Sequence, residues 1–520
     1  MGLPQHLCAL LAPEAYSHQV VAVRLIETPT SWVLLTGAFA YKIKRPVQYP
    51  FVDQRSLEHR RELCEEELRL NRRFAPELYL QVDPITMRSG HARMGGEGEA
   101  AEYAVRMLQF DVEAGLDRLL ASGDVTPAQL RRFGEELAAL HSRLPVAGPG
   151  QASGRPDTVR EQLRANFEQC LGYAARLGRA TDIEALREPL ECAIVAAGAY
   201  LEERFTAGHV RECHGDLHAR NIVRYGGRLL AFDCIEFEPA LRWIDVADDL
   251  SFLLMDLQVR QARRHAQALL GGYLDTSGDF RVCRLGRMYG AHRALVRAKV
   301  AAIEASGSVT AVVRDEALAQ FQAYQLAARQ LLAPARALLV LMHGTSGSGK
   351  TWLAGQLAAE IGAVHIRSDV ERRRLGDRAL RDRAASGLLE GLYTKEWTQR
   401  VYEHLGRCAT EALAGGYSVI LDATFLRREE RASLITMAAT LKVPLRLVHC
   451  HAPMQVQRTR IERRRAGGLD ASEADLRVLA WQQEHLQAPA ADEGITILDA
   501  DTTEVDVVER ITRSLRHLTE

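Results

Sequence analysis

The segment that most constrains the fold of this 520-residue chain is a glycine-rich loop, Gly-Thr-Ser-Gly-Ser-Gly-Lys-Thr, at residues 344–351. The apolar run 338–343 precedes it and predicts a buried strand, and a helix is expected from Thr351. In such a loop the backbone N–H groups can wrap phosphate oxygens, and the helix N-terminus adds its positive end. The pattern therefore predicts a nucleotide site in this strand–loop–helix setting. Its expected members are Gly344, Thr345, Ser346, Gly347, Ser348, Gly349, Lys350 at the β- and γ-phosphates, and Thr351 at Mg²⁺.

Beyond this loop, predicted strands at 363–367, 417–422 and 445–450 alternate with predicted helices. Such alternation is typical of a parallel sheet with helices on both faces. Asp369 and Asp422 follow two of these strands, and the carboxyl ends of parallel strands face the ligand crevice. We predict Asp369 as the base for an acceptor hydroxyl and Asp422 as a Mg²⁺ ligand through water, although simple capping of the strand ends would also explain both residues.

An arginine-rich stretch at 458–465 follows, on a predicted helix. Arginines on a mobile lid can contact the transferring phosphoryl group, and Arg458 is our candidate for contact with ATP. A solvated basic helix face is the competing interpretation.

A second motif, His-Gly-Asp-Leu-His-Ala-Arg-Asn, occupies residues 214–221. Phosphoryl transfer to a hydroxyl needs a carboxylate that takes the hydroxyl proton and oxygen ligands for Mg²⁺. Asp216 suits the first role, and Asn221 offers a neutral oxygen five residues later. A short predicted hairpin then returns the chain to Asp233, a second carboxylate for the same ion.

The N-terminal region reads as short strands at 20–26, 32–35 and 39–44, followed by a charged helix at 56–74. Lys42 and Lys44 face the same side of the third strand, and we favour Lys42 as the phosphate-positioning cation because Ala40 precedes it, as in V-A-I-K. Its helix partner is expected among three consecutive glutamates, of which we choose Glu67. A solvated helix face would explain the glutamates equally well.

From residue 127 onward the pattern is mostly helical, so a small β-rich lobe precedes a larger helical lobe. Pro334 ends a helix just before the strand at 338 and marks the best domain boundary. The expected divisions are 1–110 for the β-rich lobe, 111–333 for the helical lobe and 337–520 for the P-loop domain. The fold class is thus a protein-kinase-like α+β arrangement followed by an α/β P-loop NTPase domain with a parallel sheet.

The His-Gly-Asp spacing with Asn221 and Asp233 resembles the aminoglycoside phosphotransferases and related small-molecule kinases. That resemblance implies a catalytic base at Asp216 and Mg²⁺ ligands at Asn221 and Asp233. It also implies a supporting aspartate behind the loop; Asp245 and Asp249 both fall in that region, and we choose Asp245. The sequence lacks a G-x-G-x-x-G loop, and Asp233 is followed by Cys-Ile rather than Phe-Gly. The C-terminal part resembles AAA-type P-loop kinases, a group that includes gluconate kinases, polynucleotide 5′-kinases and zeta-toxin-like kinases. The whole chain looks like bacterial proteins that join these two domains.

Composition limits the other possibilities. A net charge of −1 argues against a dedicated nucleic-acid binder. Nine scattered cysteines are typical of a reduced compartment, and no signal peptide or 18-residue apolar run is evident, so a cytoplasmic, membrane-free location is expected. His449, Cys450 and His451 fit the end of a buried strand better than a metal site.

These observations predict a bifunctional phosphotransferase that moves the γ-phosphoryl of Mg-ATP to an alcohol group of a small molecule. Two alternatives remain open: one domain is a nucleotide-sensing regulatory module, or the P-loop domain phosphorylates nucleic-acid ends. The sequence leaves the acceptors, the preference for ATP over GTP, the oligomeric state and any coupling between the sites undetermined.

Overall fold

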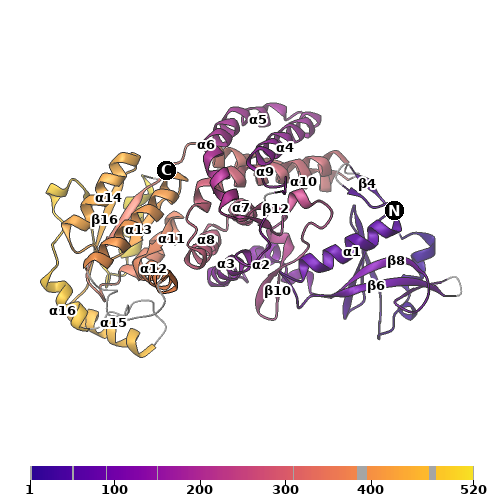
Figure 1. Cartoon of the computed structure of the whole chain (residues 1–520), viewed down its shortest axis with the longest axis horizontal. Coiled ribbons are helices and arrows are strands. Elements are labelled where there is room, and N and C mark those ends of the chain that lie inside the picture. Colours follow the sequence, from indigo (N-terminus) through magenta and orange to yellow (C-terminus); the bar gives the residue numbers. More distant parts are fainter. Residues whose placement is uncertain are drawn as a thin grey trace. The chain divides into compact units, whose positions relative to one another are not determined.

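The computed structural model describes residues 3–49, 52–88, 91–148, 150–307, 310–382, 395–467 and 476–518 (Figure 1). Contacts along the chain separate two compact units. The first contains residues 1–129, 140–163 and 201–256, and the second contains 130–139, 164–200 and 257–520. The second unit therefore combines helices from the middle of the chain with the whole C-terminal part.

The first unit is built on a six-stranded antiparallel sheet with the order β1-β2-β3-β8-β6-β7. Alternation of side chains across β3 sets its two faces. Tyr41 and Ile43 join the core on one face, whereas Ala40 joins the core beneath helix α1 on the other. Lys42 and Lys44 therefore lie on the α1 side. The bounds are β1 Arg24–Glu27, β2 Ser31–Leu35, β3 Phe39–Lys44, α1 Leu57–Asn71, β6 Tyr79–Arg88, β7 His91–Met94 and β8 Ala100–Leu108; two two-residue strands, β4 Gln48–Tyr49 and β5 Val52–Asp53, pair separately.

Two small antiparallel pairs carry the second motif. Strand β9 (Val210–Glu212) pairs with β12 (Trp243–Asp245), and β10 (Ile222–Tyr225) forms a hairpin with β11 (Arg228–Ala231). Gly226 and Gly227 turn this hairpin with φ values of 56° and 78°, which glycine adopts without strain. The hairpin returns the chain from Asn221 to Asp233.

Helices make up most of the chain between β8 and β13. They are α2 Leu116–Ser122, α3 Pro127–His141, α4 Pro156–Arg176, α5 Ala180–Glu184, α6 Arg187–Thr206, α7 Val246–Val259, α8 Arg263–Ser277, α9 Val282–Gly307 and α10 Ala311–Leu332; short 3₁₀ turns are η1 Gln5–Leu11, η2 Pro13–Ala15, η3 Val112–Ala114, η4 Ala219–Asn221, η5 Pro239–Leu241 and η7 Ala491–Glu493.

The C-terminal part folds around a five-stranded, all-parallel sheet with the order β14-β15-β13-β16-β17. The central strand β13 is buried along its whole length, as expected for a parallel sheet covered on both faces. The elements are β13 Leu339–His343, α11 Lys350–Ile361, β14 Val364–Arg367, α12 Ser368–Asp382, α13 Lys395–Ala414, β15 Val419–Asp422, α14 Arg428–Leu441, β16 Leu445–His451, α15 Met454–Gly467, α16 Leu476–Glu484, β17 Thr496–Asp501 and α17 Val507–Arg516.

Within the second unit, α8 and α9 pack against this P-loop region. Arg374 of α12 donates to the carbonyl oxygens of Asp275 and Thr276 at 2.7 and 3.1 Å, at the C-terminal end of α8. Arg284 of α9 pairs with Glu411 of α13 at 2.8 Å. At Gly415 a Cβ atom would lie 2.1 Å from the Cys283 carbonyl oxygen, so the two backbones are in direct contact.

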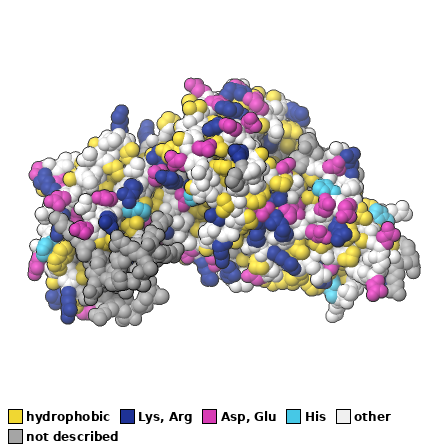
Figure 2. Space-filling view, in the orientation of Figure 1, with side chains coloured by type: hydrophobic (Ala, Val, Ile, Leu, Met, Phe, Trp, Pro, Cys, Tyr) yellow, Lys and Arg dark blue, Asp and Glu magenta, His cyan; other side chains and the backbone are white. Residues whose placement is uncertain are grey.

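The predicted fold class is confirmed, and most predicted elements are present with shifted ends. The first predicted strand, 20–26, is β1 at Arg24–Glu27, and the predicted helix 56–74 is α1 at Leu57–Asn71. Strands β6, β7 and β17 were not predicted, nor were the short strands β4, β5, β9 and β12. No helix in the described ranges has the length and apolar character needed to cross a membrane. Figure 2 shows basic and acidic side chains interspersed over the visible face.

Candidate active sites

The first candidate site is built on the His-Gly-Asp loop, residues 214–221. Asn221 Nδ2 donates to the Asp216 carboxylate at 2.8 Å and to its carbonyl oxygen at 3.0 Å. His218 Nε2 lies 3.4 Å from the same carboxylate. These contacts orient the Asn221 side chain with its nitrogen toward Asp216. Its oxygen therefore remains available as a ligand for a cation.

A buried aspartate at the start of α7 holds this loop. The Asp249 carboxylate accepts from the backbone N–H groups of His214 and Gly215 at 3.1 and 2.9 Å. Burial opposes ionisation of Asp249, but the hydrogen bond and charge of His141 lower its pKa overall. Gly215 has a φ of 85°, and a Cβ there would lie 2.6 Å from the Leu241 carbonyl oxygen, so only glycine fits the turn.

The supporting aspartate read as Asp245 requires correction. Asp245 accepts two hydrogen bonds from Arg204, at 2.6 and 2.8 Å, instead of contacting residues 214–221. Asp249 contacts the loop because it lies in the first turn of α7, while Asp245 ends β12. A second helix residue, Asp256, accepts from the Ala219 N–H at 3.0 Å.

Both lysines of β3 contact Glu67, a residue of α1 that is completely buried. Lys42 Nζ lies 2.9 Å from Glu67 and 2.5 Å from Asp233, and Lys44 Nζ contacts Glu67 at 2.5 Å and also Glu236. Burial opposes the charge on each group, yet the opposite charges dominate: they lower the pKa of Glu67 and raise the pKa of Lys42. From the sequence, Lys42 and Lys44 were alternatives for the phosphate-positioning cation. In the structure both lysines form an ion pair with Glu67.

Asp233 adopts an unusual backbone conformation, with a φ of 65°. Its N–H donates to the Tyr79 hydroxyl at 3.1 Å, and its carboxylate is 44% exposed. A left-handed conformation at a residue other than glycine costs free energy and is frequent at functional sites. The carboxylate of Asp233 and the side-chain oxygen of Asn221 are oxygen ligands of the kind that Mg²⁺ prefers.

The second candidate site surrounds the P-loop, residues 344–351. Lys350 is nearly buried, and its Nζ donates to the Thr345 carbonyl oxygen at 2.8 Å. The loop leads into α11, whose first turn contains Lys350 and Thr351. These residues open onto a cavity of about 1040 Å³, at the upper end of the range for small-molecule pockets, roughly 300–1,000 Å³.

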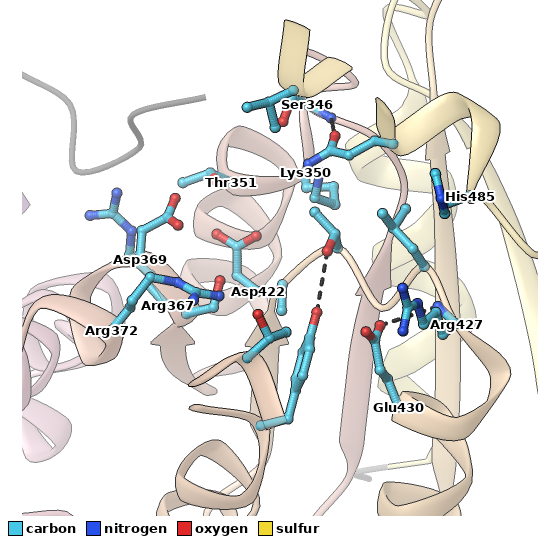
Figure 3. Close-up of a pocket in the computed structure, with 18 of the residues that line it drawn as sticks. Ser346, Lys350, Thr351, Arg367, Asp369, Arg372, Asp422, Arg427, Glu430 and His485 are labelled. Atoms are coloured by element: carbon cyan, nitrogen blue, oxygen red, sulfur yellow. Dashed lines mark hydrogen bonds between the residues drawn. The ribbon is translucent and has the colours of Figure 1, made fainter. Parts of the chain in front are cut away.

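The two carboxylates predicted for this site, Asp369 and Asp422, also line the cavity. Strands β14 and β15 pair in parallel with Arg367 opposite Asp422, so Asp369 follows at the same edge of the sheet. Figure 3 shows Asp422 below Lys350 and Thr351, with Asp369 to one side and Arg427 to the other. Burial raises the pKa of Asp422, but the hydrogen bond from His365 at 3.2 Å and the charges of His365 and Lys350 lower it overall.

Arg458 does not line this cavity, and its side chain is exposed. Arg460, two residues later, does: it donates to the Thr502 hydroxyl at 2.8 Å and to the Gly347 carbonyl oxygen at 3.3 Å. Helical periodicity places residues two apart about 200° around the axis, which explains why only one of the pair faces the loop. The side chains of Arg464 and Arg465 lie outside the described residues.

Several residues of the cavity wall had no sequence signal, because they come from α13, α14 and α16 or from positions next to these helices. They include Tyr402, Arg427, Glu430, Trp481, Gln482 and His485. Phe425, in the loop after β15, is buried with a φ of 46°, a strained conformation for a bulky residue. Arg431 fixes that loop by donating to the Phe425 carbonyl oxygen at 2.9 Å while its guanidinium pairs with Glu493.

The His-Cys-His run lies in β16, as the strand interpretation predicted. Alternate side chains point to different partners: His449 Nδ1 lies 2.8 Å from His343 Nδ1, and His451 Nε2 lies 3.0 Å from Asp499. Cys450, between them, is buried in the sheet core. The three side chains thus have separate packing roles.

Comparison with known proteins supports the two-domain organisation. Residues 40–284 match the family described as "Phosphotransferase enzyme family", and residues 339–489 match the family described as "AAA domain". Among solved structures, a choline/ethanolamine kinase family protein from Mesorhizobium loti is 16% identical, with a TM-score of 0.35, over 59% of this chain and 92% of that one. A gluconokinase from Sinorhizobium meliloti is 18% identical, with a TM-score of 0.27, over 36% of this chain and 95% of that one.

Curated relatives extend over nearly the whole chain. An uncharacterized protein of Mycobacterium tuberculosis is 31% identical over 457 residues, which cover 88% of this chain and 89% of that protein, and an uncharacterized protein of Mycobacterium bovis matches to the same extent. The matched families are of kinase type and support a phosphotransferase. In this chain a region that matches the phosphotransferase family precedes a region that matches the AAA domain, and the chain belongs to the same family as these mycobacterial proteins.

Proposed function

We propose that the chain is a bifunctional kinase, in which each of the two sites transfers the γ-phosphoryl group of ATP to a hydroxyl of a small molecule. The observation that carries this proposal is the convergence of complementary groups at both sites. At the first site Asn221 contacts Asp216, Lys42 contacts Asp233, and the backbone N–H of Phe232, next to Asp233, donates to the Asn221 carbonyl oxygen at 2.9 Å. At the second site the P-loop shares one cavity with two strand-end carboxylates.

At the first site, Asp216 orients the acceptor hydroxyl and takes its proton as the new O–P bond forms. Asn221 holds the Asp216 carboxylate in place, and the oxygens of Asn221 and Asp233 hold Mg²⁺. The bound ion neutralises charge on the phosphate oxygens. Lys42, fixed by Glu67, positions the phosphates of the nucleotide.

At the second site, the backbone N–H groups of residues 344–351 and the Lys350 ammonium bind the phosphates. Thr351 and Asp422 are the oxygen donors for Mg²⁺, and Asp369 is the base for the acceptor hydroxyl. Arg460 replaces Arg458 as the arginine that we expect beside the phosphates, because it reaches the loop.

The test uses γ-labelled ATP and a bacterial metabolite extract, with the parent protein, Asp216→Asn, Lys350→Ala and the double variant. Asp216→Asn keeps the shape and the Asn221 contact but removes the base, and Lys350→Ala removes the phosphate-binding cation. Each single variant is expected to lose a different labelled product, because the two sites act on their own acceptors.

Other outcomes separate the alternatives. Loss of every product from one variant and none from the other would make the second domain regulatory. Products that appear only when an oligonucleotide is added, and only with an intact P-loop, would favour the nucleic-acid end kinase. Unchanged labelling in both single variants and in the double variant would contradict the proposed function.

A further inference from the structure

One side chain of the P-loop cavity makes a contact that neither motif explains. Gln482, on α16, accepts a hydrogen bond from the Ser346 backbone N–H through Oε1 at 2.7 Å, drawn at Ser346 in Figure 3. Ser346 and Gln482 are 8% and 7% exposed, and both line the cavity. An N–H group of the phosphate-binding loop is thus engaged by a neutral amide.

This contact fixes the orientation of the Gln482 side chain. A backbone N–H can only donate, so the atom that faces Ser346 must be Oε1, and Nε2 is the other end of the amide. Within the described ranges Nε2 has no protein partner, although the residue is more than nine-tenths buried. An amide donor on the wall of a cavity is strongly favoured to meet an acceptor there.

The same peptide unit connects Gln482 to the lysine of the loop. Lys350 Nζ donates to the Thr345 carbonyl oxygen, and the N–H of this Thr345–Ser346 peptide donates to Gln482. Lys350 is the side chain expected at the β- and γ-phosphates. The amide and the ammonium are therefore held by opposite edges of one planar peptide group of the phosphate-binding loop.

We propose that Gln482 donates a hydrogen bond from Nε2 to the terminal phosphoryl group of ATP, so that this site distinguishes ATP from ADP. The inference rests on the proposed function of the P-loop site. A neutral donor suits this position because the Ser346 contact holds its oxygen away from the phosphates and turns its N–H₂ group toward them.

Gln482→Glu tests the donor while it keeps the contact with Ser346. Glutamate keeps an oxygen that accepts from the Ser346 N–H, but it removes the donor and adds a negative charge beside the phosphates. Because hydrogen bonds to charged groups are the strong ones, we expect the Kd for MgATP to rise roughly ten- to hundredfold. The Kd for MgADP should change much less, because ADP lacks the contacted group.

The measurement is calorimetric titration of the full chain with MgATP and MgADP. The first site is disabled by Lys42→Met, and Lys350→Ala on the same background identifies binding at the P-loop. Gln483→Glu is the matched control: its neighbour on α16 makes the same charge change, but Gln483 is exposed, contacts Met454 Sδ and does not line the cavity. Thermal unfolding checks that each variant is folded.

The expected result is a raised ratio of the Kd for MgATP to the Kd for MgADP in Gln482→Glu and an unchanged ratio in Gln483→Glu. An unchanged ratio in Gln482→Glu overturns the inference, whether both affinities fall together or neither changes. Gln482 would then have only a structural role, in which its contact with Ser346 holds α16 against the loop. If Gln482→Glu does not fold, Gln482→Ala takes its place with the same expected ratio. If Lys350→Ala leaves nucleotide binding unchanged, the proposed role of the P-loop fails, and the inference fails with it.

Discussion

Among single residues, Lys42 and Lys44 lead to the sharpest prediction, because they share Glu67 but differ in surroundings. Lys44 is buried between Glu67 and Glu236, whereas Lys42 also reaches the exposed carboxylate of Asp233. Removal of one partner from a buried ion pair costs about 3–5 kcal/mol. Lys44→Met should therefore lower the unfolding temperature more than Lys42→Met, and Lys42→Met should weaken MgATP binding at the first site more.

Thermal unfolding and nucleotide titration, both in a Lys350→Ala background, measure the two effects. Arg61→Met on the outer face of α1 is the control, because its pair with Glu65 is exposed and contributes little to stability. Loss of MgATP affinity in Lys44→Met at normal stability would reverse the assignment and make Lys44 the phosphate-positioning residue.

His343, at the end of β13, makes stability depend on pH. Burial lowers its pKa to about 3, and the charges of His449, Arg431 and Lys350 add to the effect. Its ordinary pKa is 6.5, so between pH 6.5 and 3 the unfolded chain binds a proton that the folded chain does not. The stabilising contribution is complete above pH 6.5 and falls by about 1.4 kcal/mol per pH unit as the pH drops.

We expect the unfolding temperature of the parent to drop more between pH 7.5 and pH 5.0 than that of His343→Gln, which cannot take up this proton. The exposed His6→Gln serves as the control for the loss of a histidine. Equal drops in the parent and in His343→Gln would show that the neutral form of His343 is not favoured by folding.

Among the elements, the loop between β15 and α14 depends on a distant ion pair. Arg431 is fully buried and pairs with Glu493 of η7 at 2.6 Å, and it also donates to the carbonyl oxygens of Phe425 and Gln487. Glu493→Gln leaves a buried guanidinium without its counter-charge. We expect a destabilisation of about 3–5 kcal/mol, measured as a lower unfolding temperature.

Asp492→Asn is the neighbouring control, since Asp492 pairs with Arg428 at the surface, where both side chains are more than half exposed. A surface pair of this kind contributes little to stability. Equal effects of the two substitutions would contradict the view that Arg431 anchors the loop.

Sequence patterns predicted the elements that carry strong periodicity and missed those that depend on partners. The run 39–44 alternates clearly and is β3 with the same bounds. Strand β6 was not predicted because Pro84 lies inside it, and proline is normally excluded from strand interiors; register shifts accompany it here. Strand β17 is half-exposed at a sheet edge, so its pattern is weak.

The candidate sites divide in the same way. Asp216, Asn221 and Asp233 are close in sequence, and a hairpin joins them, so local spacing was sufficient to predict that they converge. Gln482 reaches the P-loop from 136 residues away, through packing of α16 that no local pattern encodes. Asp249 rather than Asp245 supports the loop for a similar reason, because the choice depends on the direction in which each side chain leaves its element.

Across the chain, the sequence suggests a domain boundary at Pro334, but the helices on the two sides of this boundary are in contact. Residues 333–336 are exposed, yet α8 and α9 before them contact α12 and α13 after them through Arg374, the Arg284–Glu411 pair and the close approach at Gly415. We predict that a chain cut by a protease at a site inserted here stays associated. Gel filtration should show one peak at the position of the intact protein, and two separate peaks would contradict the prediction.

The backbone contact between Gly415 and Cys283 also bears on how such a gene can change. Any larger residue at 415 would meet the Cys283 carbonyl oxygen, so the glycine and the helix facing it constrain each other. Cys283 lies in the region that matches the phosphotransferase family, and Gly415 lies in the region that matches the AAA domain. Fission of the gene would separate the two sides of this contact. Exchange of either half for that of a distant homologue would combine surfaces whose shapes do not match. The two halves are thus expected to be inherited and recombined as one piece.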